Sequence, residues 1–150
     1  MQLRVIRTTI LIALGVLAAA CVGPARSYAV YESRATHSAD EAESAAQTVL
    51  AGIRDATRDD AFAPYVSVLM NDAERGASTA LDAFSSIQPP DEPSDRLRAQ
   101  LLPLLQRVEN AVAAARIAAR RGDASALAGL QGTLTRLASR LSAFLERHEP

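Results

Sequence analysis

The stretch RRGDASALAGLQGTLTRLASRLSAF, residues 120–144, contains the end of one predicted helix, a turn and most of the next helix. Arg120 and Arg121 suit the negative C-terminal end of a helix. Gly122 suits the left-handed position that follows, and Asp123 is a typical N-cap. Apolar residues then recur at alternating spacings of three and four, which predicts a helix with a narrow apolar seam. They are Leu127, Leu130, Leu134, Leu137, Leu141 and Phe144.

Three earlier segments show the same alternation of three and four residues, and strand-like alternation is absent. Such seams are typical of helices that pack nearly parallel, with knobs in holes. The first segment contains Ala42, Ala46, Val49, Ile53 and Ala56. The second contains Phe62, Val66, Leu69, Ala73, Gly76, Ala80, Ala83 and Ile87. The third contains Leu97, Leu101, Leu104, Val108, Ala111, Ala115 and Ala118.

Short breaks separate these segments. Within RDDAFAP, residues 58–64, Asp59 or Asp60 is a plausible cap for the second helix. The stretch QPPDEPSD, residues 88–95, is a strong helix breaker, and Asp91 or Ser94 can cap the third helix. Short connections force neighbouring helices to be antiparallel. The sequence therefore predicts an all-α fold, an antiparallel up-down-up-down four-helix bundle.

Two starting points are open for the first helix. Ser38 and Glu41 match a capping box, which would begin the helix at Ser38. A longer helix, starting near Tyr28, would place Ser38 in its interior. We favour the longer helix because the apolar seam continues backwards, through Ala39, Ala35, Tyr31 and Tyr28.

Two local features qualify the predicted bundle. Pro103 lies inside the third pattern, where it removes a backbone hydrogen bond, but its heptad position faces outward. The second segment carries a patch of small residues that allows a neighbouring helix to approach closely. This patch consists of Ala73, Gly76, Ala77 and Ala80.

The N-terminus has the features of a secretory signal segment. Residues 1–7 carry two arginines, and residues 8–22 carry no charge. A basic start, an apolar run and small residues at its end are typical of such signals. The run is shorter than the ~18–20 apolar residues of a membrane-spanning helix.

The sequence LAAAC, residues 17–21, resembles the lipobox of bacterial lipoproteins. The resemblance implies cleavage between Ala20 and Cys21, followed by lipidation of Cys21 with acyl chains such as palmitate. Two or three chains give a stable membrane anchor. This divides the chain into a signal peptide (1–20), a lipidated cysteine with its tether (21–27) and the bundle (28–150).

A second resemblance covers the bundle itself. The stretches FAPYVSVL, FSSIQPP and ARIAARRGD are similar to parts of helical-bundle lipoproteins from GC-rich bacteria that have no assigned function. The resemblance implies a bundle and supplies no active site.

Composition and motifs argue against several function classes. The 16 basic residues are all arginine and are outnumbered by 17 acidic ones, which is not the basic footprint of a nucleic-acid-binding protein. The single cysteine excludes an internal disulfide. His37 and His148 lack partners at metal-ligand spacing, and no Glu-x-x-His pair occurs. We therefore expect no metal, no cofactor and no enzymatic activity. Capping explains the RGD tripeptide at residues 121–123 better than cell adhesion does.

The expected protein is a membrane-anchored, extracytoplasmic component of the cell envelope with a structural or protein-interaction role. Its partners would be the membrane, through Cys21, and another envelope protein or a second copy of the chain. Four apolar residues off the seams, if exposed, would form a docking surface. They are Val68, Leu81, Leu102 and Ile117. The alternative is a carrier or sensor that binds an apolar small molecule in a cavity.

Overall fold

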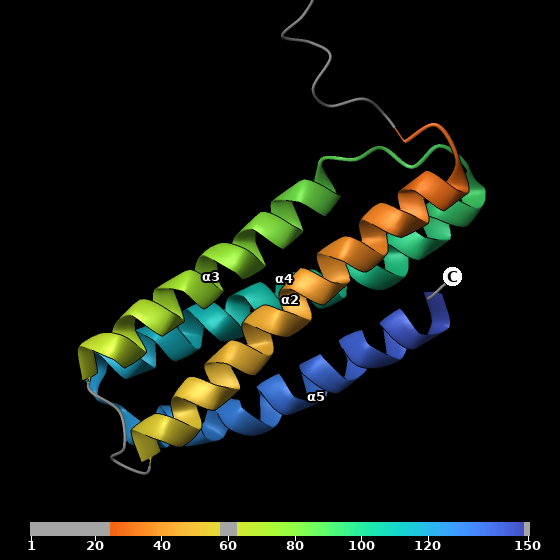
Figure 1. The fold of residues 1–150 in the computed structure, drawn as a ribbon. Helices are drawn as coiled ribbons and strands as arrows, with labels where there is room; N and C mark the ends of the chain where they lie inside the picture. The colour runs from red at the N-terminus through yellow and green to blue at the C-terminus, as the bar shows by residue number, and fades with distance from the viewer. Residues whose placement is uncertain (1–24, 58–62, 149–150) are drawn as a thin grey trace, which may run out of the picture.

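A computed structural model describes residues 25–57 and 63–148 of the chain. These residues form four α-helices, and no strand occurs among them. The helices are α2 (Tyr28–Thr57), α3 (Ala63–Ser85), α4 (Glu92–Arg121) and α5 (Ala124–His148). They pack as an antiparallel up-down-up-down bundle, which confirms the predicted fold class (Figure 1). The expected caps Asp59 and Asp60 and the seam residue Phe62 lie outside the described residues.

The helix α2 begins at Tyr28, so the longer of the two expected helices is the correct one. The hydroxyl oxygen of Ser27 lies 3.4 Å from the N–H of Val30, and the carbonyl of Ser27 accepts from the N–H of Tyr31. Ser27 is therefore the N-cap residue of α2. Ser38 is buried inside it and caps nothing.

Of the two pairs of diagonally opposed helices in the described bundle, only α2 and α4 contact each other. Both α2 and α4 contact all three other helices, whereas α3 and α5 do not contact each other within the described residues. The inner face of α2 is rich in alanine, and a small side chain lets a facing helix approach closely. The buried alanines are Ala35, Ala39, Ala42, Ala45 and Ala46.

The turn between α3 and α4 is fixed by Asp91 and Arg98. The Asp91 carboxylate accepts from the Ser94 N–H at 2.9 Å and from the Ser94 hydroxyl at 2.6 Å, so Asp91 is the N-cap of α4. Arg98 donates to the carbonyls of Ile87 at 2.7 Å and Ser85 at 2.8 Å. The sequence offers Asp91 or Ser94 as the cap, and the structure selects Asp91. No local pattern predicts the role of Arg98, because its acceptors are backbone carbonyls before the start of α4.

The turn between α4 and α5 has the predicted left-handed glycine and the predicted N-cap aspartate. Gly122 adopts the left-handed conformation, with φ at 65°, and its N–H donates to Ala119. The Asp123 carboxylate accepts from the N–H of Ala126 at 2.9 Å, which caps α5. Adhesion therefore need not be invoked for residues 121–123.

The predicted seams of α2, α4 and α5 face the core. Leu130 of α5 is partly buried, and the side chain of Ala56 in α2 lies outside the described residues. The predicted seam of α3 is buried at only four of its seven described positions. The structure buries Met70, Ala77 and Phe84 there, whereas Ala83 is exposed and two others are partly exposed. Positions 83 and 84 point about 100° apart around the helix, and the larger Phe84 fills the core against Tyr31, with ring centroids 5.4 Å apart. The two partly exposed residues are Leu69 and Gly76.

The small patch on α3 does face a close neighbour. A Cβ atom placed on Gly76 would lie 3.9 Å from the Cβ of Ala45 on α2. An even closer approach occurs at Gly52, where a Cβ would lie 3.0 Å from the Met70 Cε. Pro103 lies within α4 and is exposed, as its heptad position predicts.

Candidate functional site

The expected lipidation site, Cys21, and the expected cleavage position after Ala20 lie outside the described residues. The structure does describe residues 25–27, the last part of the expected tether. Ala25 is buried in the core cluster, and Ser27 is the N-cap residue of α2. The chain is therefore packed against the bundle from four residues after Cys21.

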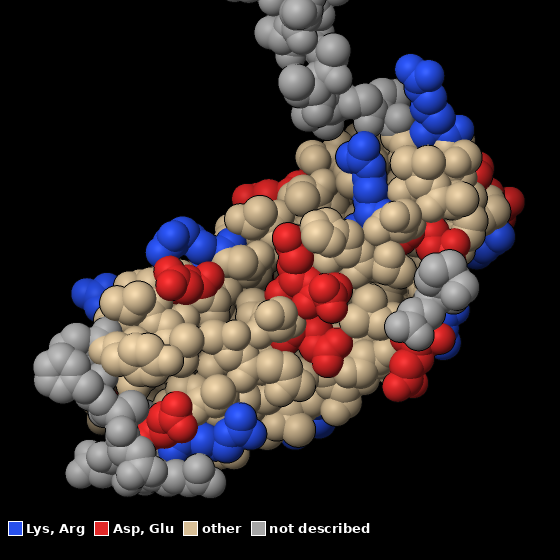
Figure 2. Space-filling model, in the orientation of Figure 1, with Lys and Arg blue, Asp and Glu red and all other residues tan. Residues whose placement is uncertain are grey.

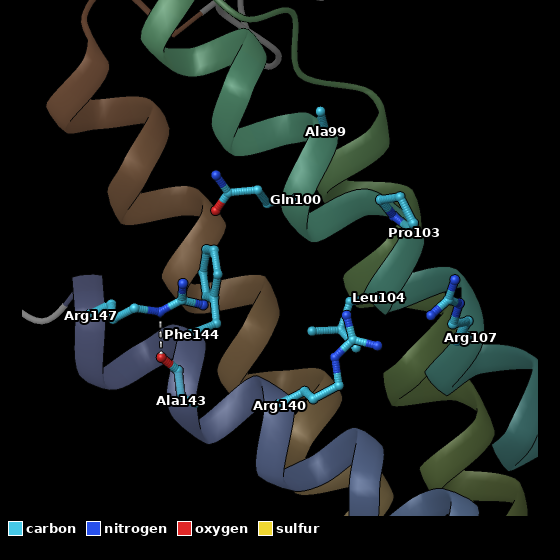
Figure 3. A pocket seen from close by; sticks show the side chains of 9 residues that line it. All are labelled: Ala99, Gln100, Pro103, Leu104, Arg107, Arg140, Ala143, Phe144 and Arg147. Atoms are coloured by element: carbon cyan, nitrogen blue, oxygen red, sulfur yellow. Dashed lines mark hydrogen bonds between the residues drawn. The ribbon is translucent and has the colours of Figure 1, made fainter.

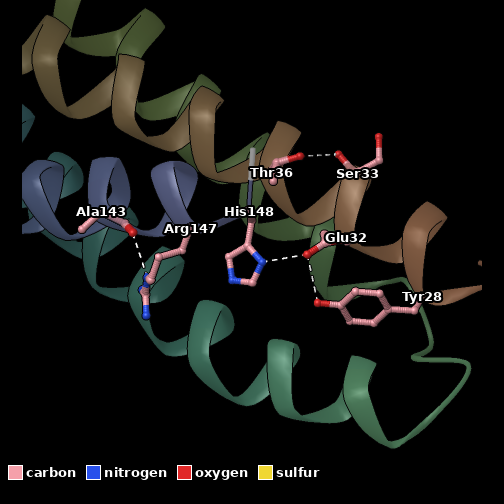
Figure 4. Close-up of polar contacts among 7 residues, drawn as sticks. All are labelled: Tyr28, Glu32, Ser33, Thr36, Ala143, Arg147 and His148. Carbon is pink, nitrogen blue, oxygen red and sulfur yellow. Dashed lines mark hydrogen bonds and ion pairs between the residues drawn. The ribbon is translucent and has the colours of Figure 1, made fainter. Parts of the chain in front are cut away.

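A polar cluster joins the first turns of α2 to the last turn of α5 (Figure 4). Glu32 accepts from the Tyr28 hydroxyl at 2.9 Å, and its Oε1 lies 2.8 Å from Nδ1 of His148. The His148 ring lies on Phe144, with ring centroids 4.5 Å apart. Partial burial of Tyr28, followed by its hydrogen bond to Glu32, raises the pKa of the phenol above its ordinary value. The Tyr28 hydroxyl and Nδ1 of His148 both contact Oε1 of Glu32, so the cluster fastens two helix ends.

A groove of about 470 Å³ lies between α4 and α5 (Figure 3). Its inner wall includes Leu104 and Phe144, which are buried. The small side chains of Ala99 and Ala143 leave room between the helices. Its remaining lining residues are polar, cationic or cyclic: Gln100, Pro103, Arg107, Arg140 and Arg147.

The three arginines of this groove are exposed, and none forms an ion pair with a carboxylate in the described part of the chain. Arg140 extends from α5 toward α4, and Arg107 lines the groove from α4 (Figure 3). Arg147 donates from Nε to the carbonyl of Ala143 at 2.8 Å, which orients its guanidinium. These arginines are not among the residues predicted from the sequence to have a function. The signal available was their helical spacing on two segments predicted to pack together.

A second groove, about 610 Å³, lies between α2 and α3. Small residues such as Ala45 and Gly76 form its base. Acidic side chains gather over the middle of α2 (Figure 2). Arg75 of the opposite wall pairs with Asp72, one turn away on the same helix, at 2.5 Å. This surface is predominantly acidic and already contains the counter-ion for its arginine.

Neither histidine has a metal-site environment. His37 is exposed and lies 3.4 Å from Glu41, one turn further along α2. His148 pairs with Glu32. Residues 25–57 and 63–148 contain no group of three histidine, cysteine, aspartate or glutamate side chains that could hold a metal ion.

The four apolar residues off the seams divide into two pairs. Leu81 and Leu102 are partly buried and pack against the core. Val68 and Ile117 are exposed. The structure adds Tyr65, which is 59% exposed and lies one helical turn before Val68, itself 58% exposed. Tyr65 is not among the predicted docking residues, although its spacing of three from Val68 was a usable signal.

No family model matches the sequence, and comparisons with curated proteins and with solved structures gave no match. Among the described helices, none is both long enough and apolar enough to cross a membrane.

Proposed function

We propose that this chain is a lipid-anchored, extracytoplasmic bundle that serves the cell envelope as a structural or protein-interaction component. The observation that carries the proposal is the position of Ala25. Ala25 is buried against the bundle four residues after Cys21, the sole cysteine. Four extended residues span about 14 Å at most. An acyl anchor on Cys21 would therefore hold the end of the bundle where α2 begins close to the membrane.

An interaction role is supported by exposed apolar surface away from this end. Tyr65 and Val68 lie one turn apart in the N-terminal half of α3, which starts at the opposite end of the bundle from α2 (Figure 1). Exposed apolar side chains at helical spacing suit a partner helix. The partner would be another envelope protein or a second copy of the chain.

The alternative, a carrier of an apolar small molecule, has less support. The two grooves described above are lined in large part by charged side chains, which suit polar ligands better than apolar ones. The largest buried side chains of the core, Tyr31 and Phe84, pack directly against each other.

The lipid anchor is tested by the variant Cys21→Ser, expressed in the native host and compared with Arg26→Gln as a control in the same segment. The wild type and the control should incorporate radiolabelled palmitate and sediment with membranes. Cys21→Ser should do neither. Full membrane retention of Cys21→Ser would refute the anchor.

The interaction surface is tested by photo-crosslinking in intact envelopes. A photoreactive amino acid at Val68 should yield a discrete crosslinked species. The matched control is the same amino acid at Gln131, an exposed residue of α5, because α5 does not contact α3 within the described residues. Equal crosslinking from both positions would contradict a specific surface on α3.

A further inference from the structure

The arginines of the α4–α5 groove differ from those in ion pairs elsewhere on the bundle. Arg75, Arg96 and Arg116 each pair with a carboxylate. Their acidic partners are Asp72, Glu92 and Glu74. In the groove, by contrast, Arg107 and Arg140 approach from two helices and have no carboxylate partner among the described residues.

Like charges that face each other repel, and the repulsion is relieved when an anion lies between them. A guanidinium also presents a planar fork of donors that matches the oxygens of a phosphate group. Arg147 adds a third guanidinium at the same groove, held by its bond to Ala143. No acidic side chain lines the groove among residues 25–57 and 63–148.

The rest of the groove suits the carbon part of a small ligand. Its volume of about 470 Å³ is that of a typical small-molecule site. Pro103, which is exposed, provides apolar surface, and Gln100 provides an amide that donates or accepts.

We infer that the groove between α4 and α5 binds a phosphate-bearing ligand, with Arg107 and Arg140 as the principal contacts. Two sources of this chemistry are available, a free phosphate compound and the headgroup of an anionic phospholipid. The groove includes Arg147, in the last turn of α5, and this helix end lies beside the start of α2 (Figures 1 and 4). A phospholipid ligand therefore rests on the proposed lipid anchor, which would bring the groove close to a membrane. Binding of a free phosphate compound does not depend on the anchor.

The test uses the full chain purified in an uncharged detergent. The probes are inorganic phosphate, dihexanoyl phosphatidylglycerol and, as a zwitterionic control, dihexanoyl phosphatidylcholine. Binding is measured by isothermal titration calorimetry at low ionic strength. The wild type should bind phosphate, phosphatidylglycerol or both, and if it binds phosphatidylglycerol it should bind phosphatidylcholine more weakly.

The double variant Arg107→Gln/Arg140→Gln should weaken binding by roughly tenfold or more, because it removes two charge-assisted contacts. The matched control is Arg34→Gln/Arg136→Gln, which makes the same change in charge at exposed positions outside the groove lining. This control should bind as the wild type does. A circular dichroism melt establishes that both double variants are folded.

The outcomes separate the two sources. Binding of phosphatidylglycerol without binding of inorganic phosphate supports a lipid headgroup, and the reverse supports a free phosphate compound. Equal weakening by both double variants would overturn the site, because it would reflect general surface charge. Absence of binding to every probe would also overturn it. Neither result would bear on palmitate labelling of Cys21, so the anchor stands or falls separately.

Discussion

His148 and Glu32, 116 positions apart in the sequence, approach to 2.8 Å between Nδ1 and Oε1 at one end of the bundle. Both side chains are largely buried, with exposed fractions of 16% and 29%. The contact joins the last turn of α5 to the first turns of α2, and Tyr28 donates to the same carboxylate oxygen. The end of the bundle that would face the membrane is therefore held together by polar contacts as well as by the apolar core.

Replacing His148 with alanine should loosen this end without unfolding the bundle. The variant loses the contact with Glu32 and the packing on Phe144. The expected loss of stability is about 1 kcal/mol, the usual size of one hydrogen bond. Hydrogen exchange should show faster opening of the last turn of α5, while α3 is unchanged. Uniformly faster exchange in all four helices would contradict a local role.

Replacement of Gly122 and of Gly129 by alanine should change the free energy of unfolding in opposite directions, although both positions have open space for a Cβ atom. A Cβ at Gly122 or at Gly129 meets no atom within 4 Å, and only Gly122 has a positive φ. Gly129→Ala should stabilise the bundle by about 0.5–1 kcal/mol, because alanine is the better helix former. Gly122→Ala should destabilise it by about 1–2 kcal/mol, the cost of a left-handed L-residue. Urea denaturation measures both, and equal signs would show that backbone conformation does not decide these positions.

Tyr31→Phe should leave stability unchanged or increase it. The Tyr31 side chain is fully buried, and its hydroxyl has no hydrogen-bond partner in the described structure. An unsatisfied buried hydroxyl costs about 1–3 kcal/mol, which phenylalanine avoids while keeping the ring against Phe84. Thermal melts should show a Tm equal to or above that of the wild type. A lower Tm would indicate that the hydroxyl bonds to a buried water.

Pro103→Ala should stabilise α4. Proline has no N–H to donate to the carbonyl of Ala99, and its ring crowds that turn of the helix. Alanine restores the donor at an exposed position, with an expected gain of up to about 3 kcal/mol. Urea denaturation gives the free energy of unfolding. A loss of stability would show that the helix depends on the proline.

The N-cap of α4 should make stability depend on pH in the acidic range. Hydrogen bonds from the Ser94 hydroxyl and then from the Ser94 N–H lower the pKa of Asp91 below its ordinary value of 3.8. Because the folded pKa is the lower one, this stabilisation is fully present above the unfolded value. It is lost as the pH falls through the folded pKa.

Asp91→Asn separates capping from titration, because asparagine caps a helix about as well as aspartate but carries no titrating group. The variant should resemble the wild type in urea denaturation near about pH 7 and lose less stability on acidification to about pH 3. The variant Asp91→Ala, which removes the cap, should be less stable at both pH values. An Asn variant with the full acid sensitivity of the wild type would exclude Asp91 as its source.

The sequence by itself determined the four helices of the described bundle and most of their ends. A cap such as Asp91, a left-handed glycine such as Gly122 and a seam of leucines act within one or two turns, so neighbouring residues suffice to predict them. The short breaks then determine that neighbouring helices are antiparallel.

Only the tertiary structure decided, at three positions of α3, which of two neighbouring residues faces inward. Residues three and four positions after a buried residue such as Ala80 lie on either side of it around the helix, so spacing alone does not choose between Ala83 and Phe84. The volume available beside Tyr31 selects the larger one. The pairing of His148 with Glu32 and the convergence of Arg107 with Arg140 depend likewise on how helices meet in space. Such contacts join residues far apart in the chain, and no local pattern specifies them.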